Sequence, residues 1–140
     1  MKTAIKEKDI VKTLMNNGSF NILLKTFRAT GLIDILRNAN SVYTLFAPNE
    51  KAFKKLSPSG MLKRLLKDRD LLTRVIAYHI IPARVDLKHV DGRKTVKTLE
   101  GKSLLIDTTS GLRVNNSAIL RAGIECGNGL IHEIDSVLLP

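Results

Sequence analysis

Several residue types are scarce in the sequence, and each shortage excludes a class of protein. Cys126 is the single cysteine, so no disulfide can form within the chain and cysteine usage does not identify the compartment. Lysine, arginine, aspartate or glutamate interrupts every apolar run well before the roughly 18 residues that a membrane-spanning helix needs. We therefore expect a soluble chain with no membrane span.

Aromatic residues are also scarce. They make up 4% of the chain, and tryptophan is absent. Proteins that read single-stranded nucleic acid stack its bases on aromatic side chains, and no recognised nucleic-acid-binding motif is present. We expect no specific nucleic-acid partner.

The start of the chain lacks the apolar stretch of roughly 7–15 residues that a secretory signal contains. Charged residues are spread through it: Lys2, Lys6, Glu7, Lys8, Asp9 and Lys12. Two alternatives follow. The protein is extracellular, periplasmic or on the cell surface if a signal has been removed, and it is cytoplasmic if Met1 is the native start.

Apolar side chains, in contrast, are plentiful. They make up 44% of the 140 residues, which is enough for one continuous core. No linker, repeat or low-complexity tract divides the chain. We expect a single domain over residues 1–140, and a monomer.

Positive charge is in excess and unevenly placed. The formal net charge is +10, and residues 1–70 carry 14 basic against 6 acidic residues. A solubilising surface is the simpler interpretation, and a polyanion-binding face is the alternative. The candidate polyanion-binding residues are Lys51, Lys54, Lys55, Lys63, Arg64 and Lys67.

The first half of the sequence predicts helices. Asp9 is a candidate N-cap for a helix that ends at Asn17-Gly18, and Ser19 is a candidate N-cap for a helix that ends at Thr30-Gly31. A short helical turn over 32–36 follows. Asn49 is a third candidate cap, for a helix through Leu56, and apolar residues at helical spacing predict two more helices, over 61–67 and from about 70 to 78.

Strands dominate the second half. The uncharged run 42–46 predicts one buried strand before Pro48. Beyond Pro82 the apolar period falls to roughly two, which predicts strands over 94–99, 102–107, 112–116, 118–120 and 130–139. Because the helices precede strands that are joined by hairpins, the pattern favours an α+β fold with a largely antiparallel sheet.

No catalytic or metal-binding pattern emerges from the reactive residues. His132-Glu133 lacks the second histidine of a zinc-protease helix, because that position is Ser136. Cys126 and His132 form the one nucleophile–base pair that we can nominate, and no nucleophile motif supports it. Phosphate-binding loops are absent too, so we expect no enzyme activity, no cofactor and no metal.

Three motifs together resemble the fasciclin domain. They are Thr44-Leu45-Phe46-Ala47-Pro48-Asn49 followed by Phe53, Tyr78-His79-Ile80-Ile81-Pro82, and Asn128-Gly129 through His132 to Pro140. The match runs from Asp9 to Pro140 in the family's order. The chain most resembles the single-domain, prokaryotic members of the family. The resemblance implies a β-wedge of about seven strands in two sheets with several helices packed along it.

The resemblance also implies a function, which is adhesion or protein and glycan binding without catalysis. It points to Tyr78 and His79 as candidate binding residues, together with Arg84, which adds a charge where a glycine is common. His79 and His132 are more simply explained as buried framework. The implied partner is a cell-surface or matrix protein or an acidic glycan. Residues that the resemblance makes structural are Thr44, Phe46, Ala47, Pro48, Asn49, Phe53, Asn115, Asn128, Gly129 and His132.

Two departures from the family pattern are informative. Gly123-Ile124 stands where some animal members carry an Asp-Ile pair associated with integrin binding, so that route is doubtful here. Asn116 stands where the family's Val-Asn-Gly turn has its glycine. We expect Asn116 to tolerate a positive φ there, since asparagine does so best among the non-glycine residues.

Overall fold

The computed structural model describes residues 9–38 and 40–140. Its α-helices are α2 (Ile10–Asn17), α3 (Asn21–Thr30), α4 (Leu32–Leu36), α5 (Glu50–Lys54), α6 (Met61–Lys67) and α7 (Arg69–Ala77). Its strands are β1 (Tyr43–Pro48), β2 (Ile80–Ile81), β3 (Arg93–Lys97), β4 (Ser103–Asp107), β5 (Arg113–Val114), β6 (Ser117–Cys126) and β7 (Gly129–Ile134), and a 3₁₀ turn covers Leu87–His89. The predicted α+β class is confirmed.

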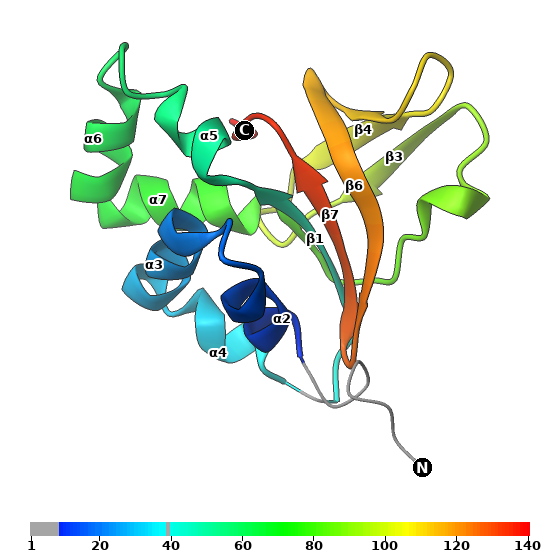
Figure 1. The fold of residues 1–140 in the computed structure, drawn as a ribbon, viewed down its shortest axis with the longest axis horizontal. Coiled ribbons are helices and arrows are strands. Elements are labelled where there is room, and N and C mark those ends of the chain that lie inside the picture. The colour runs from blue at the N-terminus through cyan, green and yellow to red at the C-terminus, as the bar shows by residue number, and fades with distance from the viewer. Residues whose placement is uncertain (1–8, 39) are drawn as a thin grey trace.

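The seven strands are hydrogen-bonded in the order β2-β1-β7-β6-β5-β4-β3. Every neighbouring pair is antiparallel except β1 and β7, which are parallel. The pairing is one continuous order, so the expected division into two sheets is not confirmed. Figure 1 shows the helices on one side of β1 and β7, with β3 and β4 on the other.

Two apolar cores lie on the two sides of β1. Leu45 and Ala47 pack with the helices, whereas Phe46 faces the space between β1 and β3–β5, where it joins Val96 and Ile106. Since successive side chains of a strand point to opposite faces, β1 serves both cores and every one of its residues is buried.

Cap chemistry explains several of the helix boundaries. The Asp9 carboxylate accepts a hydrogen bond from Lys12 N (2.8 Å), and the Asn49 amide oxygen accepts one from Ala52 N (2.9 Å). Gly18 ends α2 with φ at 81°. These three predictions are confirmed.

The predicted Ser19 cap is wrong. Helix α3 begins one residue later than that cap implies, after Phe20, which makes no side-chain cap bond. The carboxylate of Glu50 instead accepts the bond from Ile22 N (2.7 Å), reaching α3 from the start of α5. A cap supplied from 28 residues away leaves no signal in the local sequence.

Strand β6 is the largest difference from the predicted pattern. It runs over Ser117–Cys126, whereas the sequence predicted only 118–120. Irregular register against β7 near Arg121, together with mostly exposed residues from 120 to 125, removes the alternation that marks a strand. Strand β7 in turn ends at Ile134, five residues earlier than predicted.

The described residues contain no helix long and apolar enough to cross a membrane.

Candidate functional site

His79 lies at the end of α7 and is fully buried. Its Nδ1 is 2.7 Å from the carbonyl oxygen of Val75, and its Nε2 is 2.9 Å from Leu138 N. A carbonyl only accepts and an N–H only donates, so the ring is neutral with its proton on Nδ1. Burial lowers the pKa of His79 from 6.5 to about 4. His79 therefore joins α7 to the C-terminal segment and does not reach solvent.

Tyr78 is also interior, with 6% of its surface exposed. Its hydroxyl donates to the carbonyl oxygen of Ser103 (3.0 Å) and accepts from Asn115 Nδ2 (3.1 Å). Asn115 completes the junction, because its Oδ1 accepts from Leu105 N (2.9 Å). The Tyr78 side chain thus connects the end of α7 to β4 and to the β5–β6 turn.

Arg84 is the exposed member of the three candidate binding residues. Nearly half (47%) of its side chain is exposed, and it forms an ion pair with Glu125 (3.3 Å). The backbone on either side is held by Thr44, whose hydroxyl donates to Ala83 O (2.7 Å) and accepts from Val85 N (2.8 Å). A buried threonine therefore fixes the loop that carries Arg84.

His132 holds the same loop from a second direction. Its Nε2 donates to Val85 O (2.9 Å), and its Nδ1 accepts from Gly123 N (2.9 Å), so the ring has the tautomer opposite to that of His79. Burial lowers its pKa, partly offset by the bond to Val85 and by the charge of Asp86. Gly123 has φ at 73°, and this left-handed conformation in the irregular part of β6 accompanies the turn of its N–H toward His132.

The geometry separates Cys126 from the base nominated for it. Both ring nitrogens of His132 are occupied by backbone groups, while the Cys126 thiol contacts Ile124 O at 3.7 Å. Burial also raises the pKa of the Cys126 thiol, which disfavours the thiolate. No nucleophile–base pair forms between these two residues.

The Asn128-Gly129 pair ties three segments together at the other end of the wedge. The Asn128 amide accepts from Ile10 N (3.0 Å) and donates to Leu36 O (2.6 Å), which links α2 and α4. Gly129 has φ at 154°, and a Cβ there would lie 1.8 Å from Tyr43 O. Only glycine fits at this contact.

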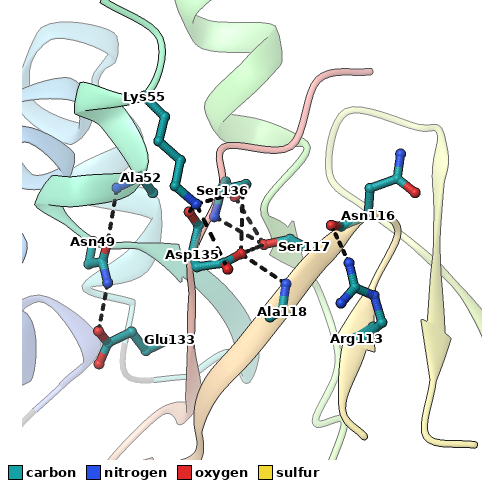
Figure 2. Close-up of polar contacts among 10 residues, drawn as sticks. All are labelled: Asn49, Ala52, Lys55, Arg113, Asn116, Ser117, Ala118, Glu133, Asp135 and Ser136. Carbon is teal, nitrogen blue, oxygen red and sulfur yellow. Dashed lines mark hydrogen bonds and ion pairs between the residues drawn. The ribbon is translucent and has the colours of Figure 1, made fainter. Parts of the chain in front are cut away.

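A polar cluster surrounds the end of β7 (Figure 2). Asp135 Oδ1 accepts from Ala118 N (2.9 Å), Ser117 Oγ (3.1 Å) and Ser136 Oγ (3.3 Å). The Lys55 ammonium donates to Asp135 O (2.6 Å), and these contacts hold the pKa of Asp135 below its usual range although burial opposes them. Asn49 adds a bond from its Nδ2 to Glu133 Oε2 (2.9 Å).

This cluster changes the interpretation of Lys55. Lys55 is one of the six candidate polyanion-binding residues, but its ammonium bonds the backbone and the carboxylate of Asp135 at the end of β7. The other five are exposed, and within residues 9–38 and 40–140 none of them forms an ion pair. They are Lys51, Lys54, Lys63, Arg64 and Lys67. These five exposed residues of α5 and α6 make up the candidate basic face.

Sequence reasoning assigned the left-handed turn residue incorrectly. Asn115, not Asn116, has the positive φ (50°), and Asn116 accepts from Arg113 through its carbonyl oxygen (2.6 Å; Figure 2). Asp135 and Glu50 were also missed, since their partners lie far away in the sequence. The described residues contain no group of three or more histidine, cysteine or acidic side chains that could hold a metal ion.

Comparison with known proteins gives consistent matches. The model of the fasciclin domain family matches residues 18–140. The Synechocystis protein sll1735 is 33% identical over 131 residues, covering 94% of this chain and 97% of the relative. The cell surface glycolipoprotein MPB83 of Mycobacterium bovis is 36% identical over 110 residues, covering 78% of this chain and 48% of the relative. The chain thus spans about half the length of this mycobacterial relative.

The fold also matches a solved structure. The FAS1 domain pair of the insect cell adhesion molecule fasciclin I superposes with a TM-score of 0.77 at 22% identity, covering 95% of this chain and 51% of that one. At this identity the likeness concerns the fold.

Proposed function

Because the chain belongs to the fasciclin domain family, we propose that it is a non-catalytic adhesion module that binds a cell-surface or matrix protein or an acidic glycan, acting as a monomer outside the cytoplasm. The names of two related proteins support this assignment. MPB83 is a cell surface glycolipoprotein, and fasciclin I is a cell adhesion molecule.

The observation that carries the proposal is the rigid presentation of Arg84. Thr44 and His132 fix the backbone of the loop at three points, Ala83 O, Val85 N and Val85 O, while nearly half of the Arg84 side chain stays exposed beside Glu125. A charged side chain on a pre-ordered loop loses less conformational entropy when it binds than one on a mobile loop. This is the arrangement expected of a binding residue.

A pocket of about 250 Å³ lies beside this loop, lined by Arg84, Val85, Asp86, His89, Val90 and Lys94. Its charged rim is mainly basic. The acidic member, Asp86, already accepts from Lys88 N (3.1 Å), and this bond lowers its pKa more than any other contact. Arg84 and Lys94 together outnumber Asp86, so the pocket is a candidate site for a carboxylate or sulfate of a protein or glycan partner.

Tyr78 and His79 have an indirect role in this proposal. Both are buried, so they act by positioning the surrounding elements. A substitution at either residue is expected to alter attachment through the fold, whereas Arg84→Ala removes a contact and leaves the fold intact.

The test is attachment of cells or of immobilised acidic glycan to purified protein. We expect Arg84→Ala to weaken attachment about 1.4- to fivefold, since an exposed charged contact contributes roughly 0.2–1 kcal/mol. Lys25→Ala, which removes an exposed cation of α3, is the matched control for lost charge. Equal attachment by wild type and Arg84→Ala, with unchanged thermal stability, would refute the role of this loop.

The second candidate function is charge-driven polyanion binding by the exposed basic face of α5 and α6. It is favoured by the five cations there that form no ion pair with another described residue. Heparin retention should fall steeply with salt, and Lys63→Gln should elute earlier than Lys55→Gln, which loses the same charge, because Lys55 is engaged by Asp135. Elution of wild type at ordinary ionic strength would exclude this function.

A further inference from the structure

A second groove lies away from the Arg84 loop, between α6, α7 and the turn that joins β3 to β4. Its volume is about 210 Å³. The lining residues are Met61, Arg64, Leu65, Leu71, Arg74, Val75, Glu100, Lys102, Leu139 and Pro140. Four separate segments contribute to it.

The floor of the groove is apolar. Leu65 and Val75 are each 1% exposed and belong to the helical core, and Met61 and Leu71 pack partly buried against that core. Leu139 adds a large apolar side chain that is 47% exposed at the open side. An apolar ligand placed here would remove this surface from water.

Three cations stand around that floor. The side chains of Arg64, Arg74 and Lys102 make no hydrogen bond or ion pair with any residue in the described part of the chain. Glu100 is the one acidic residue of the lining, and its carboxylate accepts from the backbone N–H of Lys102 (3.0 Å). The groove therefore combines an apolar floor with a rim of three cations and one carboxylate.

The walls are held together by the buried Tyr78-His79 pair. His79 bonds Val75 O of α7 and Leu138 N, next to Leu139 in the C-terminal segment. The Tyr78 hydroxyl donates to Ser103 O, and Ser103 directly follows Lys102 at the start of β4. The groove is thus fixed by buried hydrogen bonds before any ligand arrives, which lowers the entropy cost of binding.

We propose that this groove binds a small amphiphile with one anionic headgroup, its hydrocarbon part on the apolar floor and its carboxylate or phosphate between Arg74, Lys102 and Arg64. A volume of about 210 Å³ corresponds to roughly seven water-sized groups. That size fits a chain of about eight carbons better than a two-chain lipid. The site is independent of the Arg84 loop, so either one can fail without the other.

Four probes separate headgroup from tail. They are octyl phosphate, octanoate, octanol and inorganic phosphate, titrated into the full chain and followed by calorimetry and by ¹⁵N chemical shifts. We expect octyl phosphate, octanoate or both to bind and to shift the amides of Leu71, Val75 and Leu139, while octanol and inorganic phosphate bind at least about tenfold more weakly. Comparison of the two anions identifies the preferred headgroup.

Variants place the site. Arg74→Gln and Lys102→Gln change exposed side chains and are expected to weaken binding of the preferred anion at least about fivefold, as charge-assisted contacts are lost. Arg121→Gln, an exposed cation on β6, is the matched control and should bind as wild type does.

Four results would overturn the proposal. Equal binding of inorganic phosphate would mean diffuse attraction to surface charge, equal binding of octanol would mean an apolar cleft without a headgroup site, and no binding of either anion would mean no site. Preference of these residues for an acidic polysaccharide over both anions would assign them to the basic face instead.

Discussion

Acidification should destabilise the fold through His79 within a defined pH window. In the folded chain the ring is neutral, because Nε2 accepts from Leu138 N and protonation there would set two donors against each other. The unfolded chain takes up a proton near pH 6.5, whereas the folded chain does so near pH 4. The stability that His79 contributes is therefore complete above about pH 6.5 and is lost as the pH falls toward 4.

The size of the effect follows from the two pKa values. A difference from 6.5 to about 4 corresponds to about 3 kcal/mol of unfolding free energy. The slope in the middle of the window is about 1.4 kcal/mol per pH unit for one proton. His132 changes in the same direction, since burial lowers its pKa too. The lowered carboxyl pKa values of Asp86, Asp107 and Asp135 cost stability from the acid end of this window downward, as the unfolded carboxyls take up protons from about pH 5.

The assay is urea unfolding, followed by circular dichroism, at pH 7, 6, 5 and 4.5. His79→Gln keeps an amide donor and acceptor but cannot titrate, so its stability should fall less steeply with acidification than that of wild type. ¹⁵N spectra of wild-type histidines give an independent check that needs no variant, with the proton on Nδ1 of His79 and on Nε2 of His132. Equal slopes for both chains, or a His79 ring that titrates near pH 6.5 in the folded protein, would refute the reasoning.

Three further substitutions test the framework by chemical denaturation. Gly129→Ala should lower the free energy of unfolding by more than about 3 kcal/mol or prevent folding, because its Cβ would lie 1.8 Å from a backbone oxygen. The control Gly18→Ala, whose Cβ would meet nothing within 4 Å, should cost only about 1 kcal/mol. Similar losses in the two variants would argue against the collision. Asn128→Ala should cost about 2–4 kcal/mol, since it leaves a helix N–H and a helix carbonyl without partners in the interior, and a loss below about 1 kcal/mol would contradict this. Tyr78→Phe should cost about 1–2 kcal/mol by removing a hydroxyl with two partners, and an unchanged midpoint would show that water replaces them.

Local chemistry determined which parts of the fold the sequence predicts well. Asp9 and Asn49 cap helices that begin beside them, and both are recognisable because the cap and the capped N–H are three residues apart. The helices also bury one face, which gives a clear period. The uncharged run of β1 and the alternating apolar residues of the β3–β4 hairpin likewise predict these strands to within a few residues.

Long-range contacts account for the errors. Glu50 caps α3 from 28 residues away. The local sequence offered only Ser19 as a cap, and Ser19 does not cap the helix. Asp135 gathers Ser117 and Ala118 from β6, and no spacing within the sequence indicates that cluster. The irregular part of β6 was not predicted because its residues are mostly exposed and do not alternate. Its conformation depends on pairing with β7, which the local sequence does not show.

Burial of Tyr78 and His79 determines how attachment experiments on this domain must be interpreted. Their bonds reach Val75, Ser103 and Leu138, so a substitution at either residue loosens several elements together. Loss of attachment in Tyr78→Phe would therefore not place a partner on that residue. Arg84 gives the cleaner comparison, because its ion pair with Glu125 is exposed and its removal leaves the bonds of Thr44 and His132 in place. If Tyr78→Phe weakens attachment only in proportion to its lost stability while Arg84→Ala weakens it without such a loss, the contact surface is the loop and the Tyr78-His79 pair is its support.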